Sequence, residues 1–397
     1  MPATLHHGDC LSVLRSMPDN SVDLVVSDPP YGLAEHSTAT IVAALTAWVG
    51  GDREHIPDGH GFMSARWDRF VPPPAVFDEL VRVLKPGGHA AIFSHARTQD
   101  LMGLSARLAG FELRDTFAWL NSQGMAKGTN LKRHADRLGE QYAGYASALK
   151  PGYEPILLLR APLAGSVPST IEKFGTGALN IEECRLGWAN DADRASAEAK
   201  NAHARFGSAP TMNTILGDAS MLERKDYDGG RGRWPANVIL SEEDASALDE
   251  MSGISRSYRG KPRSGRRDDD DVYGSGRAGF AGSSGPEYDD IGGASRFFYC
   301  PKVKKSDRLI LPDGTTHMTV KPRALMDWLV TLLSPPGDGV VVLDPFAGTS
   351  TTLAAAHAAG HVAIGIEDHG PHIELSRMRF DRDGAPLSVI EGLSSTG

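Results

Sequence analysis

The sequence predicts an α/β protein built on a doubly wound, mostly parallel sheet with a loop-rich insertion. Two observations carry this prediction. Short apolar runs rich in β-branched residues predict buried strands at residues 22–27, 90–93, 155–160, 340–343 and 362–366. Helical patterns follow several of these runs, at residues 75–84, 98–109 and 352–359. Alternating strands and helices are typical of a parallel sheet that helices cover on both faces.

The remaining elements of the N-terminal third are shorter. A helical pattern follows Asp9, and residues 32 to about 74 are rich in loop signals. The helix at 75–84 is expected to stop at residues 85–88, Lys-Pro-Gly-Gly. Two separate short strands are predicted at residues 111–113 and 117–120.

The bulk composition is that of a globular protein. The chain has 397 residues, of which 41% are hydrophobic and 23% charged, enough for one large domain or two ordinary ones. Neither a membrane-spanning stretch nor a signal peptide is visible. The cysteines, Cys10, Cys184 and Cys300, lie too far apart to suggest a zinc site or a disulfide framework. We therefore expect a cytoplasmic protein without a metal and without membrane contact.

Four residues at the end of the strand 22–27 carry the strongest chemical signal. Asp28-Pro29-Pro30-Tyr31 combines an acid, two prolines and an aromatic ring in a rigid polar corner. Such a corner suits one task well, holding a planar amino group by its hydrogens while a ring stacks alongside. The alternative is an ordinary turn that ends a strand, because Asp-Pro is common in turns.

A second signal follows the strand 340–343. Residues 344–351, Asp-Pro-Phe-Ala-Gly-Thr-Ser-Thr, predict a tight loop before a helix that Gly360 ends. The next strand runs into Glu367, about twenty residues past the loop, where an acid can accept hydrogen bonds from ribose hydroxyls. This order is typical of the nucleotide-binding half of a doubly wound fold. The alternative is a helix that merely packs tightly on its strand.

The character of the chain changes between residues 161 and 316. This region is polar and rich in Gly, Ser, Arg and Asp, and we interpret it as an insertion that recognises a partner, with a mobile loop at about 252–294. Basic residues cluster at 256–267 and 302–308, which suits either a grip on phosphates or a solvated, self-compensating loop. The net charge of −9 argues mildly against nucleic acid, although the local face decides affinity.

With these pieces placed, the chain resembles the amino-group DNA methyltransferases that use S-adenosylmethionine. The tetrapeptide comes first, a variable region second and the glycine loop last, which resembles the β arrangement of that family, a circularly permuted Rossmann-like domain. Stretches at residues 8–9, 84–88 and 317–322 resemble further family elements. Segments of the middle region resemble methylases of phages and mobile elements, at residues 175–180, 233–237 and 295–299.

The resemblance implies a domain organisation. Residues 1–160 would form the catalytic half of the methyltransferase domain and residues 317–385 its cofactor-binding half. Between them, residues 161–316 would recognise the target, and residues 386–397 would form a tail. The acidic corner and the cofactor loop must then meet in one cleft.

Roles for single residues follow from the same resemblance. Asp28 and the carbonyl of Pro29 would accept the two hydrogens of the target amino group, with Pro30 stiffening the corner and Tyr31 stacking on a base flipped out of the duplex. Six residues would bind the cofactor, with Glu367 on the ribose and Asp9 on the adenine edge: Asp9, Lys321, Asp344, Phe346, Gly348 and Glu367. For Lys321, a surface lysine before a helix is an equal alternative.

The implied reaction is methyl transfer from S-adenosylmethionine to the N6 amino group of adenine in double-stranded DNA, in a prokaryotic or phage-encoded protein. Adenine is favoured because the cytosine N4 members more often carry serine where Asp28 stands. N4-cytosine methylation, RNA or protein methylation and an inactive DNA-binding subunit stay open, as do a homodimer and a partner restriction nuclease. The chain departs from the family pattern at Ser350, which replaces a glycine, and at Met318, which replaces a proline.

Overall fold

The computed structural model describes residues 1–59, 61, 67–121, 128–188, 190–191, 193–195, 232–256, 291–302, 305–317 and 319–392. It divides into two compact units. The larger unit comprises Met1–Cys184, Ala236–Asp244 and Tyr299–Gly397, and the smaller comprises Arg185–Pro235 and Ala245–Phe298. Among the described residues, no helix is both long enough and apolar enough to cross a membrane. Met318 and most of the expected mobile loop at 252–294 lie outside the described residues.

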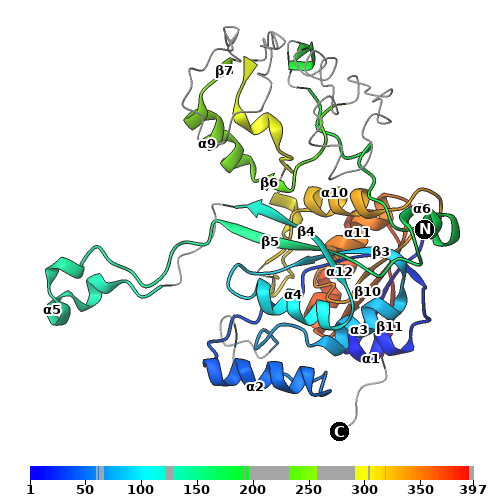
Figure 1. Ribbon diagram of the computed structural model, residues 1–397, viewed down its shortest axis with the longest axis horizontal. Helices are drawn as coiled ribbons and strands as arrows, with labels where there is room; N and C mark the ends of the chain where they lie inside the picture. The colour runs from blue at the N-terminus through cyan, green and yellow to red at the C-terminus, as the bar shows by residue number, and fades with distance from the viewer. Residues whose placement is uncertain are drawn as a thin grey trace, which may run out of the picture. The chain divides into compact units, whose positions relative to one another are not determined.

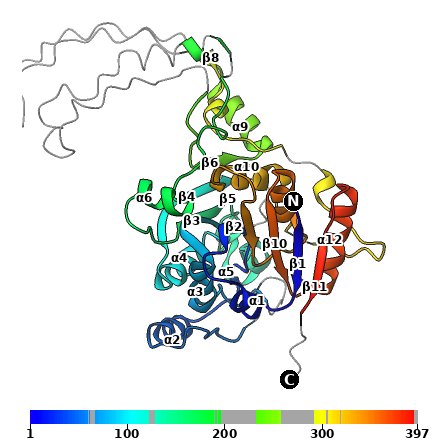
Figure 2. The same cartoon turned by 90° about the vertical axis from the view of Figure 1, so that its right-hand side faces the viewer.

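The larger unit is built on a sheet that has nine strands within the described part of the chain, in the order β11-β1-β10-β9-β2-β3-β5-β4-β6. Every neighbouring pair is parallel except the two pairs that β5 makes, with β3 and with β4. The Rossmann-like, mostly parallel sheet expected from the sequence is therefore confirmed (Figures 1 and 2). The strands are β1 (Ala3–His7), β2 (Val22–Ser27), β3 (Leu84–Phe93), β4 (Glu112–Leu120), β5 (Tyr153–Arg160), β6 (Val238–Leu240), β9 (Val341–Asp344), β10 (Val362–Glu367) and β11 (Ser388–Glu391).

Helices cover both faces of this sheet. One buried cluster joins the sheet to α10, α11 and α12, and the other joins it to α1, α2, α3 and α4. Alternate residues of β2 enter opposite clusters, Leu24 and Val26 on one side and Val25 on the other, as the two-residue period of a strand requires. The helices are α1 (Cys10–Ser16), α2 (Thr38–Val49), α3 (Pro74–Val83), α4 (Gln99–Leu108), α6 (Val167–Phe174), α10 (Arg323–Leu333), α11 (Thr351–Ala358) and α12 (Gly370–Arg382).

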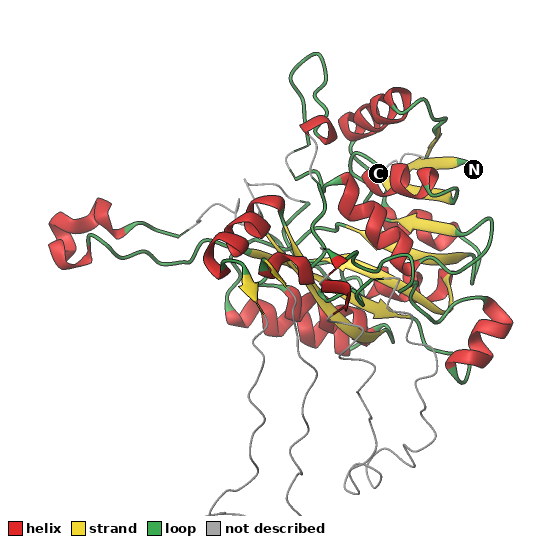
Figure 3. Cartoon of the chain, turned by 90° about the horizontal axis from the view of Figure 1, so that it is seen from above, coloured by secondary structure: helices red, strands yellow, loops and turns green. Residues whose placement is uncertain are grey.

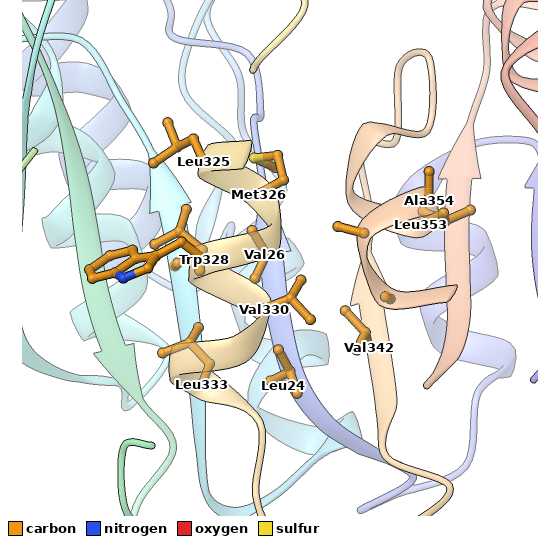
Figure 4. Close-up of a cluster of buried hydrophobic side chains, with 14 of the residues drawn as sticks. Leu24, Val26, Leu325, Met326, Trp328, Val330, Leu333, Val342, Leu353 and Ala354 are labelled. Atoms are coloured by element: carbon orange, nitrogen blue, oxygen red, sulfur yellow. The ribbon is translucent and has the colours of Figure 1, made fainter. Parts of the chain in front are cut away.

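The packing of α10 fixes the segment that precedes it. Leu325, Leu329 and Val330 of this helix are fully buried against β2 and β9. Figure 4 shows the α10 side chains beside Leu24 and Val26 of β2 and Val342 of β9. Burying one such aliphatic side chain stabilises the fold by roughly 1.5–3 kcal/mol. The start of α10, and with it Lys321, is thereby held over the centre of the sheet.

Two predicted strand boundaries in the N-terminal half are wrong. The helix α3 ends at Val83, close to the predicted end, but residues 85–88 belong to β3, which starts at Leu84 and not at residue 90. These residues interrupt the pairing of β3 with β2. Val22 pairs with Leu84, and the next pair is Leu24 with His89. Likewise, the two short strands expected at 111–120 are one strand, β4, with a register shift after Leu113.

Several elements were missed altogether, among them α2, β1, β11 and α12. α2 lies in the stretch expected to be loop, where the Ser37 side chain caps it by accepting from the Thr40 amide, and it buries Ala44 and Trp48. β1 precedes Gly8, and the expected tail contributes β11, which pairs in parallel with β1. β11 is the edge strand, in which few residues face the core, so its apolar pattern is weak.

The connection between β4 and β5 forms a hairpin of its own. Thr129 and Ser147 are hydrogen-bonded across it, and Asn130 bridges Ala146. It carries η2 (Leu131–His134), α5 (Ala135–Leu138) and η3 (Glu140–Tyr142) beyond the ends of the two strands, as Figure 3 shows.

The smaller unit contains β7 (Ser255–Arg256) paired with β8 (Ile291–Gly292), together with η6 (Ala294–Phe297). In this unit, the buried Asp193 carboxylate accepts hydrogen bonds from both terminal nitrogens of Arg233. α9 (Glu242–Ser252) links the two units, and η7 (Lys305–Asp307) belongs to the larger one. The proposed insertion at 161–316 thus contains segments that cluster with the catalytic sheet, including α6, and its target-recognition role stays a prediction.

Candidate active site

The two sequence signals lie at the ends of neighbouring strands. β2 and β9 pair in parallel, with Leu24 opposite Val342 and Val25 opposite Leu343. The chain leaves β2 for β3 on one side and leaves β9 for β10 on the other, so their carboxyl ends flank the point where the strand order reverses. In open α/β sheets, ligands bind in the crevice at such a point.

Direct contacts join the two signals. The Ser27 hydroxyl, next to Asp28, donates to Asp344 Oδ1 at 2.6 Å. A small pocket lies beside this contact, and residues of both signals line it: Ser27, Pro29, Pro72, Val76, Phe77, Leu80, Ile92, Pro345 and Phe346. The expectation that the acidic corner and the cofactor loop lie together agrees with this geometry.

A buried carboxylate fixes the backbone of the acidic corner. Asp68 Oδ1 accepts from the amides of Tyr31 and Gly32, each at 2.8 Å. Gly32 has φ +67°, and a Cβ there would lie 2.6 Å from the Val71 nitrogen. The Thr98 hydroxyl donates to the Tyr31 carbonyl at 2.7 Å. The corner is therefore held from the loop before α3 and from the start of α4.

The Asp28 carboxylate has a partner on each oxygen. Tyr31 Oη donates to Asp28 Oδ1 at 2.6 Å, and Lys321 Nζ lies 2.9 Å from Asp28 Oδ2. The Lys321 ammonium also lies 5.3 Å from the centre of the Tyr31 ring and 5.1 Å from that of Phe93. Since cations are attracted to aromatic faces, both rings help to hold it. The structure thus places Lys321 beside Asp28 and not on the surface, and the cofactor role assigned to Lys321 stays a prediction.

Glu154, which sequence reasoning missed, completes the cluster. Its Oε2 lies 3.0 Å from Tyr31 Oη and 3.2 Å from Lys321 Nζ. The side chain of Lys321 is 7% exposed, that of Asp28 20% and that of Glu154 27%. The signal that could have revealed Glu154 is an acid at the start of an otherwise apolar strand.

Burial and charge set the protonation of this cluster. Burial raises the pKa of Asp28, while the Lys321 ammonium opposes that rise. Burial also raises the pKa of Tyr31, and the two nearby carboxylates raise it further, so the phenol stays protonated. For Lys321, burial alone would lower the pKa, but Asp28 and Glu154 outweigh burial and raise it. Lys321 therefore stays a cation between two acids.

The cofactor loop is held mainly by backbone amides. The Gly348 amide donates to Glu367 Oε2 at 2.7 Å, and the Phe346 amide donates to Asp344 Oδ1 at 3.1 Å. Asp344 is buried, and burial raises its pKa to about 6, against the hydrogen bonds from Ser27 and Thr352 that lower it. The loop thus ties the ends of β9 and β10 together.

Two residues of the loop have left-handed backbone. Gly348 has φ +52°, and a Cβ on it would meet His317 Nε2 at 3.3 Å. Ser350 has φ 58°, a conformation that suits the glycine usual in the family, and its buried hydroxyl donates to Ser376 Oγ at 2.8 Å. The departure at Ser350 thus keeps the backbone shape, at a strain that a hydrogen bond to α12 offsets.

Asp9 and Glu367 stand close in the fold. The Gly8 amide donates to the Glu367 carbonyl at 2.9 Å, because β1 and β10 are neighbours. Asp9 caps α1, and its Oδ1 accepts from the amide and the hydroxyl of Ser12. Glu367 Oε1 accepts from the His369 amide at 3.0 Å and contacts His372 Nδ1 at 3.2 Å.

These residues fit the cofactor expected from the sequence. A carboxylate offers about four lone-pair sites, so Glu367 and Asp9 each keep capacity for a further donor such as a ribose hydroxyl or an adenine amino group. The side of Gly348 that lacks a Cβ faces the His317 ring. The individual cofactor roles of Asp9, Asp344, Phe346, Gly348 and Glu367 stay predictions. Within the described part of the chain, no three His, Cys, Asp or Glu side chains are grouped to hold a metal.

The chain is similar to several known proteins. A DNA adenine methyltransferase of Escherichia coli K12, YhdJ, is 23% identical over 378 residues, covering 95% of this chain and 82% of its own. The type II methyltransferase M.HinfI of Haemophilus influenzae is 44% identical over 78 residues, 20% of this chain and 21% of its own. The crystal structure of a Thermus thermophilus protein in complex with S-adenosyl-L-methionine is 20% identical, covers 99% of both chains and has a TM-score of 0.43.

The decisive match is to a protein family. The model of the family described as DNA methylase, acting at N6 and N4 positions, matches residues 22–378, which include both the acidic corner and the cofactor loop. The chain therefore belongs to the N6/N4 family of DNA methylases.

Proposed function

We propose that this chain is a site-specific DNA methyltransferase that methylates the exocyclic N6 of an adenine flipped out of duplex DNA. DNA as the substrate and S-adenosylmethionine as the cofactor follow from the family. The choice of adenine, the flipped base and the roles of single residues are our proposal. The observation that carries it is the hydrogen bond from Ser27 to Asp344, which brings the acidic corner against the cofactor loop.

The chemistry at the corner is the activation of a weak nucleophile. The lone pair of an exocyclic amino group is delocalised into the base, so the amino nitrogen attacks poorly. Asp28 and the Pro29 carbonyl accept its two hydrogens, which favours a pyramidal nitrogen with its lone pair directed at the methyl group. S-adenosylmethionine supplies that methyl group on a positively charged sulfur. The protein contributes orientation and fixed acceptors, and no covalent enzyme intermediate is needed.

Asp28 can accept further hydrogen bonds in addition to its present contacts. Each of its oxygens has one partner in the structure, Tyr31 Oη or Lys321 Nζ, and each keeps a second lone pair. Burial raises the pKa of Asp28, and the Lys321 ammonium opposes that rise by favouring the charged carboxylate. The Tyr31 ring supplies a face for stacking, worth roughly 1–3 kcal/mol per base.

The preference for adenine rests on the acid itself. Asp28 stands where cytosine N4 members more often carry serine, and the relative YhdJ is named as a DNA adenine methyltransferase. The N4 of a flipped cytosine is the second candidate, because it presents the same amino group to the same two acceptors. We also propose that residues 161–316 hold the side chains that recognise the DNA sequence.

One experiment tests these points together. The chain is expressed in a host free of DNA methylation, and its DNA is analysed by long-read sequencing. We expect N6-methyladenine in one sequence context with the wild type and none with Asp28→Ala. N4-methylcytosine in that context would establish the second candidate instead. Unmodified DNA, together with transfer of labelled methyl groups to RNA or protein, would reject the proposal.

A further inference from the structure

Glu154 lies in the active site, but the proposed methyl transfer assigns no role to it. It is the second residue of β5, which in the nine-stranded sheet of the described residues runs antiparallel to both its neighbours, and β5 begins where β3 ends. The Ser94 amide, just past β3, donates to the Pro155 carbonyl at 2.9 Å, which fixes this start. The reversed strand thus carries a carboxylate to the carboxyl edge of the sheet, beside Asp28.

The Tyr31 hydroxyl stands between the two carboxylates. Its oxygen is 2.6 Å from Asp28 Oδ1 and 3.0 Å from Glu154 Oε2. A phenol has one proton and can donate it to only one carboxylate at a time, and the shorter distance assigns that proton to Asp28. A hydroxyl that touches two acids can accept a proton from one while it donates its own to the other.

The proposed reaction requires such a proton path. When the amino nitrogen takes the methyl group, it carries one proton more than the neutral product. Asp28 is the adjacent base, and burial raises its pKa toward accepting that proton. A protonated Asp28 can no longer act as a charged acceptor, so the proton has to leave before the next turnover.

We propose that Glu154 receives the proton that methylation releases, by way of Asp28 and the Tyr31 hydroxyl. This inference rests on the proposed function. The methylated nitrogen loses its extra proton to Asp28, Asp28 passes a proton to Tyr31 Oη, and Tyr31 releases its own proton to Glu154. Tyr31 ends as it began, Asp28 is a carboxylate again, and Glu154 is a neutral acid. Because its side chain is 27% exposed, Glu154 returns the proton to water.

The other charged and titratable neighbours suit this path. Lys321 contacts both carboxylates, at 2.9 and 3.2 Å, but its raised pKa keeps it a donor only. Its charge stabilises whichever acid is ionised, so the proton can move without loss of that partner. The His95 ring lies 6.4 Å from the Tyr31 ring, centre to centre.

The test replaces the acid with its isosteric amide. Glu154→Gln keeps an oxygen toward Tyr31 and Lys321 but cannot hold the proton. We expect the multiple-turnover rate of DNA methylation, with DNA and cofactor saturating, to fall at least about tenfold, since general-base groups typically contribute 10²–10⁴-fold. Added formate, a small base, should restore part of that rate in Glu154→Gln and leave the wild type unchanged.

Two further variants test whether the effect of Glu154→Gln is merely structural. Glu154→Asp keeps a carboxyl group and should retain more activity than Glu154→Gln. Glu112→Gln removes an acid from the neighbouring strand β4, where it pairs with Arg160 at 2.6 Å, and should match the wild type. The wild-type rate in the same assay tests the proposed function separately, so the relay is judged against an active enzyme.

Either of two results would overturn the relay. One is an unchanged rate in Glu154→Gln at saturating substrates. The other is a slower rate that formate does not restore and that Glu154→Asp shares, which would make Glu154 a positioning residue for Tyr31 and Lys321.

Discussion

The acidic corner and the cofactor loop begin with the same dipeptide and use it differently. Asp28-Pro29 follows β2 and Asp344-Pro345 follows β9, on adjacent strands of one sheet. The Asp28 carboxylate meets a cation, Lys321, whereas the donors around Asp344 are the hydroxyls of Ser27 and Thr352 and a backbone amide. Burial raises the pKa of both acids, to about 6 for Asp344, and at Asp28 a nearby ammonium opposes that rise. The two acids thus differ in their surroundings, which are side-chain charges at Asp28 and hydroxyls with a backbone amide at Asp344.

This contrast predicts different weaknesses. The corner depends on charges carried by side chains from distant segments, so single charge substitutions should abolish catalysis while binding survives. The loop depends on backbone shape, so added Cβ atoms should weaken cofactor binding. The following variants separate the two.

Asp28→Asn should have the largest effect. It leaves one neutral acceptor and removes the charge that faces Lys321. We expect the single-turnover methylation rate to fall at least about 100-fold, the order found when one preorganised charge-stabilising group is lost. Cofactor affinity, measured by calorimetry, should stay unchanged. If that affinity fell as far as the rate, the corner would belong to the cofactor site and the contrast would fail.

Gly348→Ala should weaken cofactor binding. Its backbone has φ +52°, and the new Cβ would press on His317 at 3.3 Å, so the loop must shift. We expect about tenfold weaker affinity, equivalent to about 1.4 kcal/mol. Gly360→Ala is the matched control, because Gly360 has φ +78° but nothing within 4 Å of a Cβ. Equal losses of affinity in both variants would point to general strain and contradict a special role of the loop.

Asp344→Asn should stabilise the fold in a pH-dependent way. The folded pKa of about 6 lies above the usual value, so ionisation of Asp344 destabilises the native state as pH rises through about 6. A shift of about two pKa units corresponds to about 3 kcal/mol at most. We expect urea denaturation at about pH 8 to show a gain of about 2 kcal/mol for the variant, fading by about pH 3, below both pKa values. A gain that is equal at both pH values would show that charge is not its cause.

Ser350→Gly should have the smallest effect. It relieves left-handed strain of about 1 kcal/mol and loses a hydrogen bond to Ser376 of about the same value, so stability should barely change. Ser350→Ala keeps the strain and loses the bond, and should destabilise by about 1 kcal/mol. Thermal unfolding of both variants distinguishes these outcomes, and a less stable glycine variant would show that the hydroxyl dominates.

The parts of the site that the sequence predicted are contiguous segments. The corner 28–31 and the loop 344–351 each follow a buried strand, and both strands appear where the apolar runs indicated. The small α2 and the edge strand β11 escaped prediction because few of their residues face the core. Lys321 was noticed, but its ion pairs with Asp28 and Glu154 were not, since both acids lie far from it in the chain.

The sequence by itself determined the local chemistry: an acid and a proline at two strand ends, a glycine where the backbone turns left-handed, and the periods that make strands and helices. These follow from backbone sterics and the spacing of apolar residues, which act over a few positions. Only the tertiary structure decided which charges surround each acid. Tyr31 and Glu154 are 123 residues apart in the chain, and they meet because β5 runs in reverse beside β3. Hydrogen bonds and Coulomb interactions act over a few ångströms of space, so the order of the sheet sets the charge of the site.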